Sequence, residues 1–175
     1  MKKIILTLIF FVALYSFAFA AGSQTVVTSD EIVYSYSTGR VVTQRVITIA
    51  FTADDTDGSI PSLTLDSDTW TDGTNSGALS KPIEGWFGYM VEIDCNHAGT
   101  EPTENSELYI YQNSLDMLGG NGVDQVDNTA EREVLFYFAS TAVTRPVYDS
   151  MVVTISQQAA ATNSATGSIR LVLTP

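Results

Sequence analysis

Residues 47–52 read ITIAFT, and their side chains alternate in character. Odd positions carry Ile, Ile and Phe, whereas even positions carry Thr, Ala and Thr, so an extended chain places the large apolar groups on one face. The same period of two recurs in short runs at 87–95, 107–110, 134–138, 151–155 and 169–173. This alternation predicts strands with one buried and one wetter face, which is typical of antiparallel sheets.

The run at 87–95 predicts the longest buried face. Its odd positions place Phe87, Tyr89, Val91, Ile93 and Cys95 on one side, against acidic residues at 92 and 94. We therefore expect Cys95 to be a buried core residue.

The rest of the chain supports an all-β fold. After residue 20, no stretch of ten or more residues shows the spacing of an amphipathic helix, and clusters of Gly, Asn, Asp and Ser separate the apolar runs. We expect residues 39–175 to form one domain, an antiparallel β-sandwich of about seven to nine strands. A β-barrel is the alternative. Residues 21–38 carry several β-branched residues and predict a first strand or an extended arm.

The first 20 residues predict an export signal. Two lysines at positions 2 and 3 precede an apolar run, and AFA at 18–20 provides the small-x-small pattern that signal peptidase requires. The remaining chain is then expected to be secreted, either periplasmic or on the extracellular surface. No later segment is long and apolar enough for us to expect a membrane span after cleavage.

The composition excludes nucleic acid as a partner. Of the eight Lys and Arg residues, two precede the expected cleavage point, which leaves six against 20 Asp and Glu. Such a surface repels phosphates, and no basic patch interleaved with aromatic residues offsets it. The single cysteine excludes an intrachain disulfide, so stability must come from core burial, from metal ions or from assembly.

One acidic turn suggests a calcium ligand set. Asp54, Asp55 and Asp57 precede Gly58 in DDTDG, and alternate carboxylates of this kind begin oxygen-ligand calcium loops. The distal Glu of an EF-hand is missing, because Asp66 stands at that spacing. The stretch is interpreted either as a calcium site, with acids at 66–72 nearby, or as an ordinary turn. No cofactor other than calcium is expected.

No catalytic constellation is visible. His97 is the single histidine, and with Cys95 it supplies too few ligands for zinc and no choice of base for a nucleophile. The glycine-rich run at 118–122 lacks the following Lys and Ser or Thr of a phosphate loop, so we expect a tight connection between strands. Trp70 lies in a polar stretch and is a candidate for an exposed sugar-stacking contact. We expect no enzyme.

Several short motifs carry a resemblance over residues 46–173. They are GYMV at 88–91, GTEPTEN at 99–105, LYI at 108–110, LDMLGGNG at 115–122, RP at 145–146 and SATG at 164–167. In this order they resemble small β-rich proteins of unknown function encoded among the structural genes of tailed phages and prophages. The resemblance implies a non-enzymatic virion or surface component and transfers no active site.

The sequence therefore leaves two alternative functions. The first is a non-catalytic exported structural or interaction protein that self-associates, or binds other surface proteins, on a cell or particle surface. Its motivation is the β-branched segment at 21–38, because such a segment can pair with a sheet edge. The alternative is a carbohydrate- or cell-surface-binding module, assisted by calcium, which would use Trp70 and the acidic turns.

Overall fold

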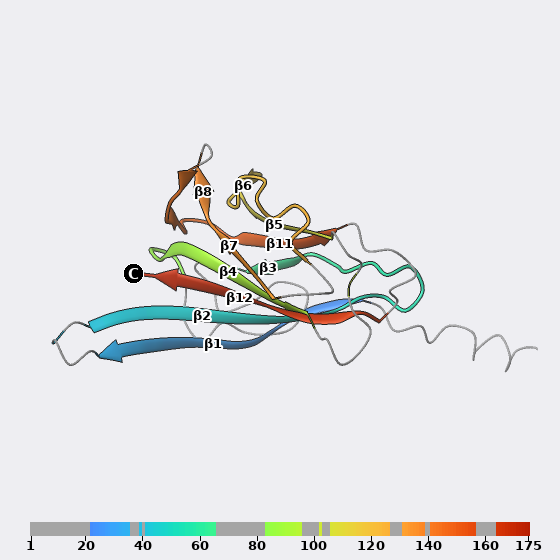
Figure 1. Cartoon of the computed structure of the whole chain (residues 1–175), viewed down its shortest axis with the longest axis horizontal. Coiled ribbons are helices and arrows are strands. Elements are labelled where there is room, and N and C mark those ends of the chain that lie inside the picture. Colours follow the sequence, from blue (N-terminus) through green and yellow to red (C-terminus); the bar gives the residue numbers. More distant parts are fainter. Residues whose placement is uncertain are drawn as a thin grey trace, which may run out of the picture.

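The computed structural model confirms an all-β fold (Figure 1). It describes residues 22–35, 39, 41–65, 83–95, 102, 106–126, 131–138, 141–156 and 164–175. The expected export signal at 1–20 lies outside these residues. The described part contains twelve strands, of which eight have three or more residues. They are β1 (Ser23–Ser35), β2 (Val41–Thr52), β3 (Leu63–Leu65), β4 (Phe87–Cys95), β5 (Glu107–Gln112), β6 (Leu115–Asp116), β7 (Arg132–Leu135), β8 (Tyr137–Phe138), β9 (Thr141–Ala142), β10 (Arg145–Pro146), β11 (Met151–Ser156) and β12 (Thr166–Thr174).

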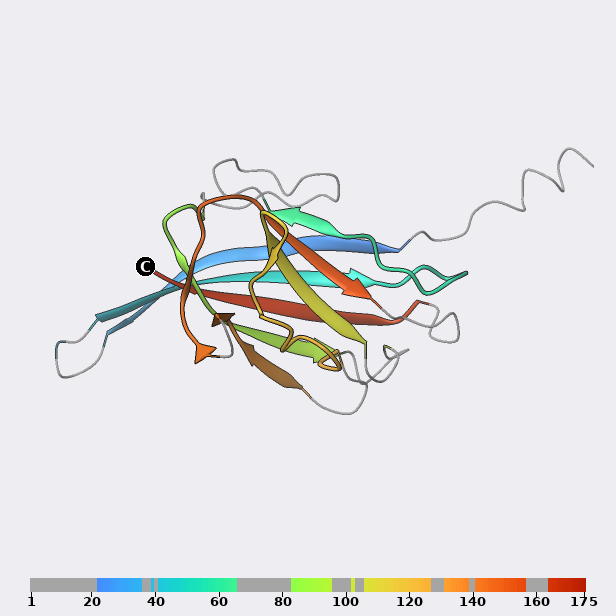
Figure 2. The same ribbon diagram turned by 90° about the horizontal axis from the view of Figure 1, so that it is seen from above.

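The strands form two antiparallel layers. The larger sheet, here sheet A, has the order β1-β2-β12-β4-β10, and β7 also pairs with β4. The smaller one, sheet B, has the order β3-β11-β5-β6, while β8 and β9 pair with each other. Figure 2 shows sheet B lying across one face of sheet A. Neither sheet closes into a barrel, so the sandwich expectation is confirmed over the barrel alternative. The segment from residue 23 to 35, predicted as a strand or an arm, is the edge strand of sheet A.

The core lies between the inward faces of the two sheets. The alternation predicted for 47–52 is confirmed, because Ile47, Ile49 and Phe51 are buried in the described structure. Inward residues of the other long strands meet them, among them Leu63, Leu65, Leu108, Ile110, Met151, Val153, Ile169 and Leu171. Each large aliphatic side chain buried in this way contributes about 1.5–3 kcal/mol. Cys95 is buried in the same core, as expected.

The prediction for the first half of β4 is wrong. Met90 pairs with Val172 and Gly88 pairs with Leu173, so Tyr89 is an extra residue, a β-bulge. A bulge shifts the alternation by one position, which reverses the faces of the residues before it. Phe87 and Tyr89 are consequently 38% and 42% exposed rather than buried.

The ring of Phe136 fills the space that the bulge leaves over the core. A Cβ added to Gly88 would lie 2.6 Å from Phe136 Cε1, so a larger residue does not fit at this position. Phe136 is completely buried, and its N–H donates to the carbonyl of Tyr89. The bulge therefore exchanges two predicted core aromatics for one that comes from the segment after β7.

Candidate functional site

Part of sheet A projects beyond the sandwich as two strands. β1 pairs with β2 from Ser23↔Thr52 to Ser35↔Val41, whereas the pairing of β12 with β2 ends at Leu173↔Arg45. Residues 32–35 and 41–44, here called the ribbon, therefore have only each other as neighbours among the described strands. Figures 1 and 2 both show β1 and β2 running past the other strands on this side. Within the described strands, the ribbon thus lacks the neighbours that support the rest of sheet A.

The ribbon carries apolar side chains in contact with solvent. Val33 is 58% exposed and Val41 is 59% exposed, and Ile32 and Val42 are half-buried. A two-stranded hairpin alone is marginally stable in water, and it becomes stable when a third strand or another layer supports it. Unsupported β-branched residues on a long edge are also typical of protein–protein contact.

A buried charge marks the base of the ribbon. Arg45 is only 1% exposed and is paired in register with Glu31 on β1. Burial lowers the pKa of Arg45 from its ordinary value, and the negative charge of Glu31 partly offsets this shift. Because an arginine stays protonated at any physiological pH, Glu31 supplies the charge that compensates a buried cation. At the base of the ribbon, Arg45 is therefore packed into the sandwich, and its interaction with Glu31 holds β1 to β2.

The first half of β1 is tied to both layers. Gln24 is fully buried, and its Nε2 donates to the carbonyls of Pro61 at 2.8 Å and Val153 at 3.3 Å. A bulge follows, because Val26 pairs with Ile49 and Thr28 pairs with Thr48, which leaves Val27 as the extra residue. The regular part of the edge thus runs over residues 28–35 of β1. It includes residues 32–35, the outer strand of the ribbon.

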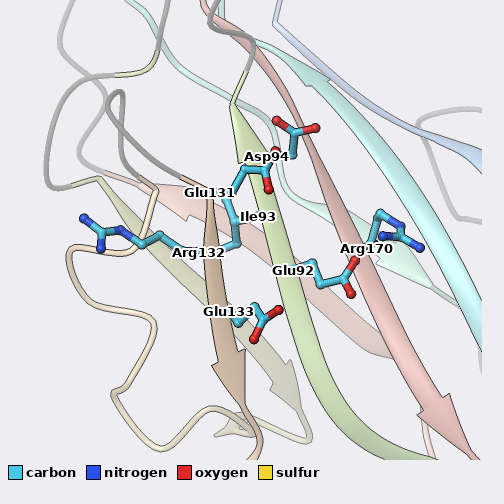
Figure 3. A pocket seen from close by; sticks show the side chains of 7 residues that line it. All are labelled: Glu92, Ile93, Asp94, Glu131, Arg132, Glu133 and Arg170. Carbon is cyan, nitrogen blue, oxygen red and sulfur yellow. Dashed lines mark hydrogen bonds and ion pairs between the residues drawn. The ribbon is translucent and has the colours of Figure 1, made fainter.

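A polar hollow lies on the outward face of sheet A (Figure 3). Glu92 forms an ion pair with Arg170 on β12 and stands opposite Glu133 on β7. Asp94 and Glu131 also line the hollow. Like charges directly opposite each other destabilise a sheet, and an exposed ion pair with Arg170 contributes only about 0–1 kcal/mol.

The predicted acidic turn forms a local hydrogen-bond network. Asp54 Oδ1 accepts from the N–H groups of Thr56 at 2.7 Å and Asp57 at 3.3 Å, and Asp57 Oδ1 accepts from Ser59 N–H at 2.9 Å. The hydrogen bonds from Ser59 lower the pKa of Asp57. Asp55 Oδ1 accepts from the Thr56 hydroxyl. The carboxylates thus shape the turn, with Gly58 at a φ of 74°.

No group of three or more acidic, Cys or His side chains that could hold a metal ion occurs within the described ranges. The acids at 66–72 and Trp70 lie outside those ranges, so calcium binding and the tryptophan contact stay predictions. The glycine-rich run at 118–122, predicted as a tight connection between strands, lies in consecutive turns after β6, and the next strand among the described residues begins at Arg132. There Asp116 accepts from the N–H groups of Leu118 at 3.0 Å and Gly120 at 2.7 Å.

Comparison with protein-family models, with curated proteins and with solved structures finds no match. In the part of the chain that is described, no helix is long and apolar enough to cross a membrane.

The sequence indicated one strand of the ribbon, because residues 32–35 lie within the segment predicted as a strand or arm, but it did not indicate the other. Residues 41–44 read VVTQ, which is rich in β-branched residues but lacks the alternation of ITIAFT. What distinguishes them is the position at which β12 stops pairing with β2, and this depends on the register between two distant segments.

Proposed function

We propose that the protein is a non-catalytic structural or interaction protein that acts outside the cytoplasm and associates with copies of itself on a cell or particle surface. The observation that carries this proposal is the ribbon, which exposes valine side chains and has no third strand beside it in the described structure. The outer edge of such a strand presents unpaired N–H and C=O groups, which are satisfied when another strand adds to the sheet.

Other features support an assembly role over a small-molecule site. The space between the sheets is filled by aliphatic and aromatic side chains that are nearly all completely buried. The expected export signal and the resemblance to structural-gene products of phages agree with a surface component. A strand added beside β1 would also reduce the exposure of Val33, which lies on β1 and is 58% exposed.

Light scattering on the chain without residues 1–20 tests the proposal. We expect the mass to rise above that of one chain as concentration increases, because association is governed by mass action. A mass equal to a single chain at every concentration, up to the solubility limit, would overturn self-association. Repeating the series with calcium and with chelator would show whether divalent ions screen the acidic surface and shift the equilibrium.

Carbohydrate or cell-surface binding is the second candidate, and a pair of tyrosines favours it. The rings of Tyr109 and Tyr111 lie parallel on sheet B, with centroids 5.5 Å apart and an interplanar angle of 15°. Both are half-buried, and Tyr109 donates its hydroxyl to Glu107 at 2.8 Å. Aromatic rings beside fixed polar groups are typical of sugar-binding surfaces. Glycan-array binding that Tyr111→Ala abolishes would support this function, and silence across a broad array would contradict it.

A further inference from the structure

We infer that self-association occurs by antiparallel pairing of β1 with β1 of a second copy, about a twofold axis that lies midway between the two copies of Ile32. This inference rests on the proposed function and specifies its contact surface. β1 has a neighbour on one side only among the described strands, and pairing across the twofold axis would join two copies of sheet A into one continuous sheet.

The charge distribution favours a second copy as the occupant. Residues 30–45 carry Asp30 and Glu31 against Arg40 and Arg45, so this segment has no formal net charge. The rest of the chain after residue 20 carries 18 acidic and four basic residues. Two copies of such an acidic protein repel each other over most of their surfaces. The edge of β1 carries Asp30 and Glu31, and Arg45 beside Glu31 offsets part of this charge, so two copies approach here at lower electrostatic cost.

The regular edge limits where the axis can lie. Residues opposite each other in an antiparallel pair share a face. A twofold axis perpendicular to the sheet therefore places one residue opposite its own copy, and never opposite the copy of the next residue along the chain. An axis at Ser29 would place Glu31 opposite Val27, inside the bulge of β1. Axes through residues 30 and 31 would set Asp30 against Asp30 or Glu31 against Glu31, which destabilises the pair.

An axis at Ile32 avoids both problems. It pairs Ile32 with Ile32 of the second copy, places Glu31 opposite Val33, and keeps seven residues, 29–35, in the ladder. An axis at Val33 also separates the acids but pairs only residues 31–35. Because each additional pair satisfies further main-chain groups, the longer ladder is favoured.

Engineered cysteines test this register. Ile32→Cys should give a disulfide-linked dimer under mild oxidation, since opposite residues in an antiparallel pair have Cα atoms about 4.5–5.5 Å apart. Val33→Cys is the matched control, because it lies diagonally from its own copy at about 7–8 Å, at or beyond disulfide reach. The unmodified chain controls for Cys95, which is buried.

A second pair of variants covers the case in which Ile32→Cys does not fold. Ser29 and Ser35 are opposite each other in the inferred register, so Ser29→Cys mixed with Ser35→Cys should cross-link, and neither should do so alone. The expected product has twice the mass of one chain on a non-reducing gel.

The outcomes separate this inference from the proposed function. Cross-linking at Val33 in preference to Ile32, or dimers by light scattering that no β1 cysteine captures, would overturn the register while self-association stands. A single-chain mass in every experiment would overturn both.

Discussion

The two halves of β2 have similar sequences and very different surroundings. Residues 46–52 have strands on both sides and sheet B across one face, and their inward side chains are buried. Residues 41–44 are equally rich in β-branched residues, yet Val41 is 59% exposed. The difference teaches that local residue preference determines whether a strand forms. How far the neighbouring strands extend along it determines whether its side chains stay exposed for binding.

The largest expected effect is in the buried half. Ile49→Ala removes three methyl or methylene groups from a fully buried site and should lower the free energy of unfolding by about 2–5 kcal/mol, measured by urea denaturation. Val41→Ala is the matched change in the ribbon and should stay within about 0.5 kcal/mol of the parent. Equal losses at both positions would mean that the ribbon is covered within a single chain.

An added methyl group sharpens the same contrast. Gly88→Ala places a Cβ about where Phe136 packs, and this overpacking should cost about 1–3 kcal/mol in the same assay. Thr43→Ile adds bulk on the ribbon face that carries Val33 and Val41 and should change stability little. If Gly88→Ala were neutral, the bulge at Tyr89 would not be held by that ring.

The smallest effect concerns the outer face of sheet B. Tyr109 donates to Glu107, and this hydrogen bond, followed by burial and the charge of Glu107, raises the pKa of Tyr109 to about 12. The raised pKa means that the contribution to stability is complete below about pH 10 and is lost as the pH rises through about 12.

Ultraviolet titration would follow this ionisation, with Tyr109→Phe to assign the signal. Glu107→Gln should return the pKa of Tyr109 toward its ordinary value, whereas the exposed acid Glu133, on the other sheet, should have no influence. If Glu107→Gln left the titration of Tyr109 unchanged, the hydrogen bond to Glu107 would not be the cause of the raised pKa.

Much of the sandwich could be predicted from the sequence, because burial follows the period of two. This holds for residues 47–52 of β2, for the alternating faces of β5 and β11, and for residues 169–171 of β12. The bulge at Tyr89 could not be predicted, since it reflects the register between β4 and β12 and has no local signal in the chain. The buried Arg45 was missed for a related reason, because its partner Glu31 lies on another strand.

For the candidate site, the segment that pairs could be predicted from the sequence, but the exposed edge of the ribbon could not. The β-branched residues at 21–38 indicated a strand or arm capable of edge pairing, and the structure adds where that edge is regular and where it extends beyond its neighbours. The acidic turn illustrates the converse. Alternating carboxylates suggested calcium, and in the structure Asp54 and Asp57 hold the turn through main-chain N–H groups.

Sedimentation velocity on a ribbon variant tests the central claim most directly. The double change Val33→Asp and Val41→Asp adds two negative charges to the ribbon while leaving the core intact. The control is the double change Val123→Asp and Val143→Asp, which adds the same charge at two exposed valines outside the ribbon. We predict that the ribbon variant sediments as a single chain at concentrations where the parent and the control associate, with unfolding curves that remain close to the parent. Undiminished association of the ribbon variant would contradict the account.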